Sequence, residues 1–209
     1  KALNFKKITI VLNKIKLFKS KCFDNIEIIK GGKSRSQSVK NALIKSKYKS
    51  NHVIIHDAAR PLYSTKLINK INKLICSNKY DCVVPYSRCS DTILDDNSDI
   101  DRSKLRLIKT PQAFKKKKLI KLHMNNKDQN ITDDSKLFRQ GTKIYNIKYL
   151  LDKYLHIKIT YKEDIISLNE LIGSKQRNGI GYDIHRTKKN HKYSFVNLGG
   201  IKVKSNIEV

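Results

Sequence analysis

Short β-type apolar runs alternate with helical patterns along most of this chain, and that alternation constrains the fold more than any other feature. Ile8–Leu12, Ile26–Ile29 and Val53–Ile55 are compact runs rich in β-branched residues, as strands are. Apolar residues at helical spacing predict helices over 36–48 and 67–75, the second behind a possible Ser64 cap. The pattern favours an α/β fold with a mostly parallel sheet, in which Val53–Ile55 is a buried parallel strand.

The second half of the chain continues the alternation. The predicted elements are strands at 82–84, 105–108 and 157–159, and helices at 115–124, 133–140 (stopped by Gly141) and from a Thr160/Glu163 capping box to about Gly173. In sheets of this kind, ligands bind beyond the carboxyl ends of the strands. The chemistry of the chain is therefore expected at those ends.

The 209 residues carry a formal net charge of +27, which would suit a protein that binds nucleic acid or an anionic membrane. The basic residues are dispersed, however, and the densest run is Lys115–Lys118. No zinc-finger spacing, RNP-type signature or basic stripe with interleaved aromatics occurs. A Lys-, Asn- and Ile-rich composition and a phosphorylated small substrate explain the charge better than nucleic acid does.

Location is expected to be cytoplasmic. No apolar run approaches the ~18 residues of a membrane span, and the first residues do not resemble a signal peptide. The cysteines, Cys22, Cys76, Cys82 and Cys89, show no C-x-x-C pairing, so they are interpreted as reduced thiols.

The first candidate site is the turn Gly31-Gly32-Lys33-Ser34-Arg35-Ser36-Gln37-Ser38-Val39, between a predicted strand and a predicted helix. Backbone N–H groups at such a turn, together with the helix N-terminus, can bind an anion or the edge of a base. Ser36 and Ser38 are equally suited to cap the helix. Spacing alone leaves both interpretations open.

The second candidate is His56-Asp57-Ala58-Ala59-Arg60-Pro61, directly after a predicted buried strand. A carboxylate at the carboxyl end of a strand, here Asp57, can hold Mg²⁺, and Arg60 can pair with a phosphate or with Asp57. A structural Asp–Arg turn closed by Pro61 is the alternative.

Hydroxyl, carboxylate and basic side chains recur farther along, at Asp91-Thr92, Asp101-Arg102, Thr110-Pro111-Gln112 and Thr132-Asp133-Asp134. Together they could converge on a phosphorylated polyol, although Thr132 is equally a helix cap. Lys158 stands between β-branched apolar residues, where a lysine is expected to have an anionic partner. Asp183 and His185 would share one face of a strand and form half of a zinc site, but the D-x-H spacing is common.

In their order along the chain, these motifs resemble the 2-C-methyl-D-erythritol 4-phosphate cytidylyltransferase family over about residues 5–173. The residues that carry the resemblance are Gly31-Gly32 with Arg35 and Ser38-Val39, the segment 56–61, Asp91-Thr92, Thr110-Pro111-Gln112, Thr132-Asp133-Asp134 and Lys158-Ile159-Thr160. Residues 179–186 and 198–201 look like the opening of 2-C-methyl-D-erythritol 2,4-cyclodiphosphate synthase, an activity fused to the first in some bacterial chains.

The resemblance implies a three-layer α/β domain of the nucleotide-diphospho-sugar transferase type over 1–173 with a mostly parallel central sheet. A linker at 174–176 and, over 177–209, the first strands of an α+β synthase domain would follow. It implies transfer of CMP from CTP to methylerythritol phosphate with release of pyrophosphate and with Mg²⁺. In the parent protein it also implies cyclisation of 2-phosphorylated CDP-methylerythritol with release of CMP. A homo-oligomer is implied, with a dimeric first domain, joined by a β-arm at about 137–153, and a trimeric second domain.

Residue roles follow from the same resemblance. Nucleotide binding is implied for Gly32, Lys33, Ser38, Ala58 and Arg60, although the family commonly has an acidic or polar residue where Lys33 stands. Substrate binding is implied for Thr92, Thr110 and Thr132, and catalytic roles for Arg102 and Lys158, which would hold the substrate phosphate, and for Asp57, near ribose, metal and substrate. Zn²⁺ or a similar ion is implied at Asp183 and His185, with a later His as third ligand.

The sequence departs from the family at both ends. Nothing matches the Gly-rich loop that cradles the triphosphate, and Val209 precedes the expected third zinc ligand. We therefore expect this stretch to be inactive in both reactions and the parent protein to perform both. The alternatives are another sugar-phosphate nucleotidyltransferase, a basic nucleic-acid-binding protein and a degraded gene product.

Overall fold

The computed structural model describes residues 7–14, 25–96, 98–128, 131–140, 142–153 and 157–173, and the backbone of 188–198 and 201–208. Residues 1–168 form one compact unit and residues 169–209 another.

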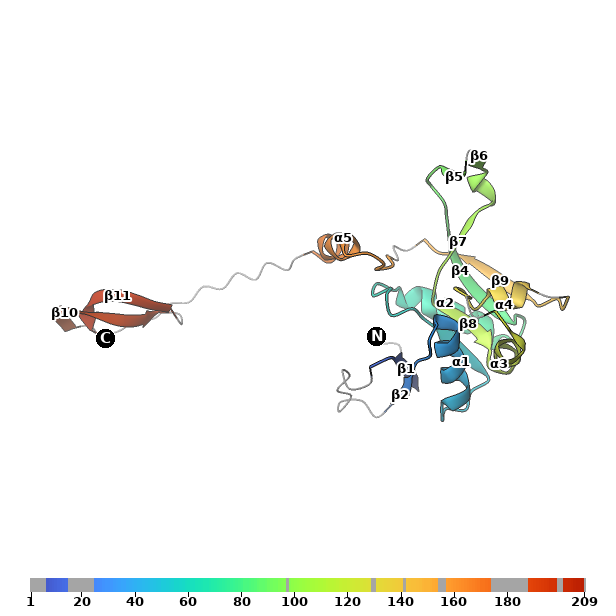
Figure 1. The fold of residues 1–209 in the computed structure, drawn as a ribbon, viewed down its shortest axis with the longest axis horizontal. Coiled ribbons are helices and arrows are strands. Elements are labelled where there is room, and N and C mark those ends of the chain that lie inside the picture. Colours follow the sequence, from blue (N-terminus) through green and yellow to red (C-terminus); the bar gives the residue numbers. More distant parts are fainter. Residues whose placement is uncertain are drawn as a thin grey trace. The chain divides into compact units, whose positions relative to one another are not determined.

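A five-stranded sheet forms the centre of the first unit. Its strands are β3 (His52–Ile55), β4 (Cys82–Arg88), β7 (Arg106–Ile108), β8 (Gln112–Lys115) and β9 (Ile147–Leu151). On one edge, β4 pairs antiparallel with β8 and then with β7, and on its other edge it pairs parallel with β9 (Figure 1). The segment 106–115 thus follows β4 as one line that is interrupted at 109–111, between β7 and β8.

The α/β class is confirmed, but the described pairings of this sheet are mixed: β4–β9 is parallel and the others are antiparallel. The prediction of a buried parallel strand at Val53–Ile55 is wrong, because β3 pairs antiparallel with β8 and its residues are half-buried. The reason lies in the connection after β4. The chain returns along the same edge of β4 and must therefore run in the opposite direction, and β3 pairs with that returning segment.

Helices cover both faces of the sheet, which gives the predicted three layers. Successive residues of a strand point to opposite faces. Val83 joins the cluster beneath α2 (Thr65–Cys76), whereas Cys82 and Val84 join Leu43 of α1 (Arg35–Lys45) and Leu119 of α3 (Lys116–Asn125). The predicted stripe of α2 is confirmed: Leu67, Ile68, Ile71 and Ile75 are buried, and Ser64 caps the helix.

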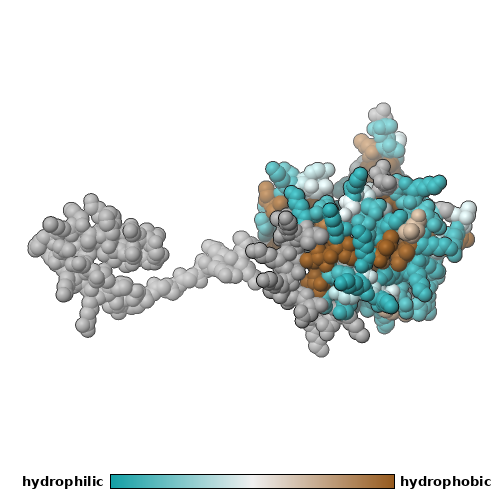
Figure 2. Space-filling model, turned by 60° about the horizontal axis from the view of Figure 1, so that its bottom comes forward, coloured by the Kyte–Doolittle hydropathy of each residue, from teal (hydrophilic) through white to brown (hydrophobic). Residues whose placement is uncertain are grey.

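A smaller parallel sheet of β1 (Ile8–Leu12) and β2 (Ile26–Lys30) precedes α1, as predicted for these strands. A short α4 (Lys136–Arg139) occupies part of the predicted helix 133–140, and Gly141 lies outside the described residues. None of the described helices combines the length and the apolar character that a bilayer crossing needs. The face of the first unit seen in Figure 2 is mostly hydrophilic, with apolar residues in separate patches.

Residues 89–96 and 98–105 belong to an arm that leaves β4 and returns to β7. The arm contains the hairpin β5 (Ile93–Asp95) and β6 (Ser98–Ile100) and a 3₁₀ turn, η2 (Arg102–Lys104), and it projects from the sheet (Figure 1). The prediction of a β-arm at 137–153 is wrong. Leu137, Phe138 and Leu150 of that range are buried in the core, which is why it cannot project.

Residues 157–159 do not form the predicted strand. The Ile159 N–H donates to the Ala59 carbonyl (2.8 Å) without a continuing ladder. The capping box predicted at Thr160/Glu163 is also wrong. At the start of α5 (Glu163–Ile172), the Asp164 carboxylate accepts from the backbone N–H groups of Thr160 and Tyr161. That helix ends as predicted at Gly173, whose φ of +66° suits glycine.

The described part of the second unit beyond α5 is an antiparallel pair, β10 (Lys188–Leu198) and β11 (Ile201–Glu208). The predicted linker at 174–176 and the predicted metal ligands Asp183 and His185 lie outside the described residues.

Candidate active site

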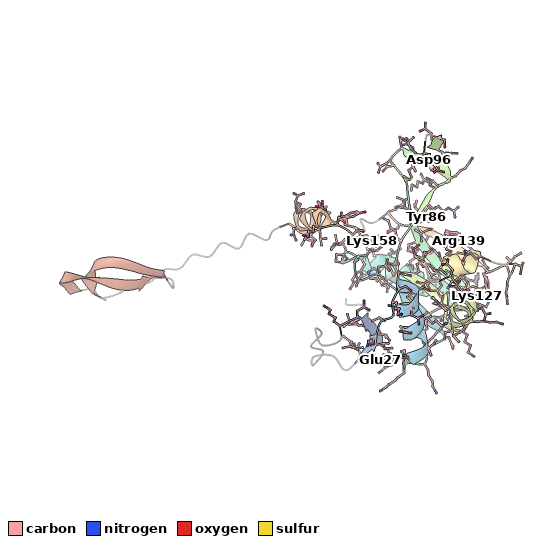
Figure 3. The ribbon with its side chains drawn as sticks, in the orientation of Figure 1. Glu27, Tyr86, Asp96, Lys127, Arg139 and Lys158 are labelled. Atoms are coloured by element: carbon pink, nitrogen blue, oxygen red, sulfur yellow. The ribbon has the colours of Figure 1, made fainter. Side chains whose placement is uncertain are left out.

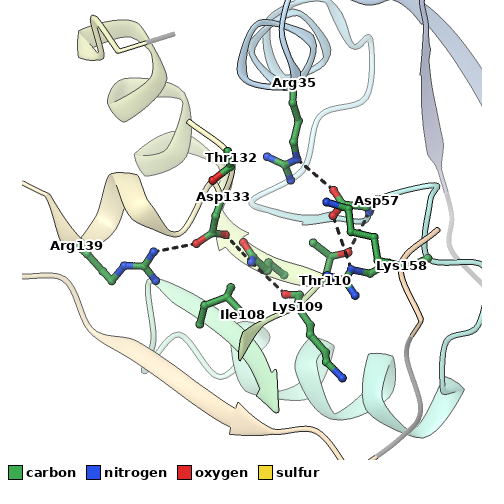
Figure 4. A pocket seen from close by; sticks show the side chains of 11 residues that line it. Arg35, Asp57, Ile108, Lys109, Thr110, Thr132, Asp133, Arg139 and Lys158 are labelled. Carbon is green, nitrogen blue, oxygen red and sulfur yellow. Dashed lines mark hydrogen bonds and ion pairs between the residues drawn. The ribbon is translucent and has the colours of Figure 1, made fainter. Parts of the chain in front are cut away.

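A pocket of about 360 Å³ opens where β3 ends and where β7 gives way to β8 (Figure 4). Its lining comes from α1, from the loop after β3, from β7, β8 and the break between them, from the segments before and within α4, and from the segment after β9 that contains Lys158. The lining residues are Arg35, Asp57, Arg60, Ile108, Lys109, Thr110, Gln112, Thr132, Asp133, Arg139 and Lys158. Arginines and lysines outnumber carboxylates among them, so the pocket is suited to an anion.

Asp57, at the carboxyl end of β3, is held between two guanidinium groups. Its Oδ1 accepts from Nε of Arg35 at 3.1 Å, and its Oδ2 lies 3.8 Å from Nε of Arg60. The Arg60 N–H also bonds the Asp57 carbonyl and closes the turn at 57–60 (3.0 Å). The Asp–Arg turn that the sequence offered as an alternative is therefore present, and it stands at the wall of the pocket.

Arg35 has a second carboxylate partner behind the pocket wall. Its Nη1 donates to Oδ2 of Asp134 at 2.7 Å, and Oδ1 of Asp134 lies 3.0 Å from Nε2 of His123. Asp134 is fully buried. Burial raises the pKa of its carboxyl group, but the hydrogen bond from His123 and the charge of Arg35 outweigh that effect and lower the pKa below its usual value. The carboxylate therefore stays charged and keeps its hold on Arg35.

The Thr110 hydroxyl fixes the loop that carries Asp57. It accepts from the Asp57 N–H (3.1 Å) and lies 3.2 Å from Nδ1 of His56. Nε2 of His56 faces the Arg60 carbonyl (3.0 Å), which can only accept, so Nε2 carries the proton in a neutral ring. Nδ1 is then an acceptor, and Thr110 donates to it.

On the far wall, Asp133 holds Arg139 and Gln112. Its Oδ2 lies 2.9 Å from Nη2 of Arg139, and its Oδ1 accepts from Nε2 of Gln112 at 2.6 Å. Ser135 adds a hydroxyl bond to the same carboxylate (2.5 Å). Figure 4 shows Arg139 and Asp133 across the pocket from Asp57 and Lys158.

The glycine turn before α1 caps that helix differently from the prediction. Ser34 is the N-cap and accepts from the Gln37 N–H (3.1 Å), whereas neither Ser36 nor Ser38 occupies the cap position. The Ser38 hydroxyl instead accepts from the Gly32 N–H (3.0 Å) and donates to the Ser34 carbonyl (2.9 Å). A Cβ on Gly32 would lie 2.6 Å from Cβ of Gln37, so the turn has room only for glycine unless Gln37 shifts.

The sequence-predicted residues fall into three groups in the described structure. Five line the pocket: Asp57, Arg60, Thr110, Thr132 and Lys158. Gly32, Lys33, Ser38 and Ala58 lie nearby in sequence but do not line it. Arg102 and Thr92 lie on the arm, where Nη1 of Arg102 bonds the Ser90 carbonyl. Figure 3 shows the tip of the arm, marked by Asp96, well away from Lys158 and Arg139.

The pocket also contains residues to which the sequence assigned no individual role: Arg35, Lys109, Gln112, Asp133 and Arg139. Each is adjacent to a predicted motif or part of one. Arg35 lies in the glycine turn, Lys109 precedes Thr110, and Arg139 lies six residues after Asp133. Their convergence depends on pairing between distant segments, which motif spacing does not contain.

The pocket carboxylates do not fit a resident metal ion. Asp57 and Asp133 already have arginine partners, which disfavour a second cation. Within the described ranges, no cluster of three or more His, Cys, Asp or Glu side chains is arranged to hold a metal.

Comparison with known proteins identifies a family. The model of the family IspD: 2-C-methyl-D-erythritol 4-phosphate cytidylyltransferase matches residues 2–174. The chain is 43% identical over 212 residues to the bifunctional enzyme IspD/IspF of Pelagibacter ubique (strain HTCC1062), covering 97% of this chain and 53% of that protein. It is 37% identical over 188 residues to the enzyme of the same name from Wolbachia sp. subsp. Brugia malayi (strain TRS), covering 86% and 45%. The chain spans about half the length of these curated relatives.

Solved structures agree in fold. The bifunctional IspDF from Campylobacter jejuni matches with a TM-score of 0.68 at 33% identity, over 78% of this chain and 42% of that one. The 4-diphosphocytidyl-2C-methyl-D-erythritol synthase from Anaerococcus prevotii DSM 20548 matches with a TM-score of 0.69 at 30% identity, over 80% and 81%.

Proposed function

Because the chain belongs to the 2-C-methyl-D-erythritol 4-phosphate cytidylyltransferase family, we propose that the protein transfers CMP from CTP to methylerythritol phosphate and releases pyrophosphate. One observation carries the proposal. Asp57, Arg60, Thr110, Thr132 and Lys158, all in motifs of that family, line a single cation-rich pocket at the end of β3.

In this reaction the substrate phosphate attacks the α-phosphorus of CTP in line, and pyrophosphate leaves. Such transfers depend on holding two anions together and on neutralising their charge. Lys158 is suited to the substrate phosphate, because it lines the pocket and has no ion-pair partner among the described residues. We assign Thr110 and Thr132 to the same substrate. Gly32, Lys33, Ser38, Ala58 and Arg60 are assigned to the nucleotide.

Enzymes of this family use divalent metals, and we propose Mg²⁺ for this reaction. Since Asp57 and Asp133 are paired with arginines, the ion would enter with the phosphates of CTP. Magnesium commonly binds in this way, through substrate phosphates and retained water molecules.

Arg102 and Thr92 can take part only if the arm approaches a pocket. Arg102 does not line the pocket of its own chain, so we propose that the arm acts in a homodimer and presents both residues to the pocket of a second copy. This keeps the roles predicted for Arg102 and Thr92 and makes the oligomer part of the active site.

The decisive experiment measures pyrophosphate release by the protein expressed from its complete gene. We expect release from CTP only when methylerythritol phosphate is present. A folded protein that releases none would refute the proposal, and equal activity with other phosphorylated polyols would favour a different sugar-phosphate nucleotidyltransferase. Tight, steeply salt-dependent binding of DNA or RNA would favour the nucleic-acid alternative.

For the longer protein we propose a second activity, cyclodiphosphate synthesis, because the similar curated proteins are named as bifunctional IspD/IspF enzymes. Asp183 and His185 would be ligands of Zn²⁺ or a similar ion there, in a trimeric assembly. Zinc analysis of the complete protein and of its Asp183→Ala variant tests the ligand assignment.

A cytoplasmic location of the protein also stays a prediction.

A further inference from the structure

Arg35 is fixed on the pocket wall by two carboxylates, and its third guanidinium nitrogen is not used. Nε is bonded to Asp57 and Nη1 to Asp134. Among the described residues, Nη2 has no hydrogen-bond partner, and 30% of the side chain is exposed while the residue lines the pocket. In Figure 4 the side chain extends from α1 toward Asp57 and the pocket.

The buried contacts between Arg35, Asp134 and His123 are expected to add little net stability, so their main effect is to orient the guanidinium group of Arg35. A buried ion pair contributes little net stability, because removing both charges from water costs about as much as their attraction returns. Here the ion pair is Arg35–Asp134, whose carboxylate is 0% exposed, and the His123 ring beside that carboxylate is 3% exposed. His123 lies in α3, and Asp134 lies in the turn before α4. One oxygen of the Asp134 carboxylate contacts His123, and the other accepts from Arg35.

An arginine held in this way is prepared for an anion. A free arginine side chain loses roughly 2 kcal/mol of rotamer entropy when it is fixed, and here folding has already imposed that loss. The N–H groups of Nη2 can then donate to a phosphate oxygen with little further ordering, which is the advantage of a preorganised donor.

We propose that Arg35 is a phosphate-binding residue of this pocket and that Asp134 and His123 are the positioning residues that aim it. The inference rests on the proposed function for the identity of the phosphorylated ligand. It does not rest on it for the anion itself, because the side chains named above would recognise any phosphate group of suitable size.

The test is calorimetric titration of the complete protein with inorganic pyrophosphate at constant ionic strength. Arg35→Lys keeps the charge but cannot bridge two carboxylates and a ligand at once. We expect it to weaken pyrophosphate binding roughly 10- to 100-fold, the worth of a charged hydrogen bond. Lys45→Ala, at the exposed end of the same helix, is the matched control and should bind like the wild type.

A double-mutant cycle tests the positioning role. Asp134→Asn alone should weaken binding, but in the Arg35→Lys background it should add little, because Asp134 acts through Arg35. A purely structural role for Asp134 would give additive losses. If thermal unfolding shows that Asp134→Asn does not fold, His123→Gln replaces it in the cycle.

The inference and the proposed function can fail separately. Loss of pyrophosphate binding in Arg35→Lys, without any CTP-dependent release by the wild type, would keep the phosphate site and reject the cytidylyltransferase reaction. Wild-type affinity in Arg35→Lys, additive losses in the cycle, or no pyrophosphate binding by the wild type would each overturn the inference.

Discussion

The Thr110 hydroxyl connects three parts of the site. It receives the Asp57 N–H, it donates to His56, and His56 in turn donates to the Arg60 carbonyl. The residue is 4% exposed. Its proton is already used, so toward a substrate the hydroxyl can only accept. Thr110 therefore holds the Asp57 loop in place whether or not it also touches the substrate.

Replacing Thr110 with valine should reveal that structural contribution. Valine keeps the shape but leaves the Asp57 N–H and His56 without this partner, so we expect the free energy of unfolding to fall by about 1–3 kcal/mol. Urea unfolding measures the change. Thr110→Ser, which restores the hydroxyl, should recover most of it, and a serine variant as unstable as the valine variant would argue against the hydrogen bonds.

Lys158 offers a second test at single residues. Lys158→Ala removes a cation that lines the pocket, and we expect KM for methylerythritol phosphate to rise about tenfold or more, since a charged hydrogen bond contributes ~1.5–3 kcal/mol. Lys162→Ala, exposed a few residues along the same segment, is the control. Steady-state kinetics of the complete protein compare the two, and equal KM values would contradict the assignment.

At the scale of the elements, the carboxylate of Asp81 connects the start of β4 to neighbouring segments. Asp81 accepts from Nζ of Lys118 at 2.6 Å and from the Asn146 N–H at 3.2 Å, and Nζ of Lys115 lies 3.3 Å away. These contacts join the start of β4 to β8, α3 and the segment that leads into β9. Burial raises the pKa of Asp81, but the lysine and backbone hydrogen bonds prevail and lower it.

The lowered pKa of Asp81 gives a pH dependence with a definite sign. The unfolded chain binds the proton at a higher pH than the folded one, so the stabilisation is complete above the ordinary value of about 3.9. It is lost as the pH falls through the folded-state pKa. We expect Asp81→Asn to be less stable than the wild type at pH 7 and to lose less stability on acidification. Chemical unfolding at pH 3 to 7 measures both slopes, and parallel slopes would contradict the expectation.

Elements set by local pattern could be predicted from the sequence, and those set by distant pairing could not. The stripe of α2 and its Ser64 cap depend on residues a few positions apart, as does the end of α5 at Gly173. The direction of β3 depends on β8, more than fifty residues later. Residues 157–159 have the composition of a strand, but within the described structure they pair with no strand, and the Ile159 N–H bonds the Ala59 carbonyl.

The site followed the same rule. Asp57 and Lys158 were identified by motif and both line the pocket. The segments that bear Asp134 and His123 come together only through tertiary packing, and no spacing in the sequence relates them to Arg35. The arm was placed at 137–153 by analogy with the family, but Leu137, Phe138 and Leu150 of that range are buried in the core.

At the scale of the whole molecule, the arm allows a test of the proposed homodimer, in which Arg102 of one copy would serve the pocket of the other. If Arg102 serves the pocket of a second copy, Arg102→Ala and Lys158→Ala should each lose most activity as pure proteins when methylerythritol phosphate is kept below the wild-type KM. Mixed dimers that contain one of each variant would have one pocket with both cations intact. Random pairing of the two variants makes about half of the dimers mixed, and each mixed dimer has one complete pocket of two. We therefore expect mixing and subunit exchange to restore up to about a quarter of wild-type activity.

The control for that experiment is a mixture of Lys158→Ala with the double variant Arg102→Ala/Lys158→Ala. No pairing of these two chains yields a complete pocket, so activity should stay low. Restoration in the control, or none in the test mixture despite proven exchange, would show that Arg102 and Lys158 do not meet across two copies.

The pairing of both pocket carboxylates with arginines has a practical consequence for assays. The lining is left with surplus positive charge, so we expect tetrahedral oxyanions in a buffer to bind in the cavity. Sulfate and phosphate salts should act as competitive inhibitors, whereas chloride at matched ionic strength should not.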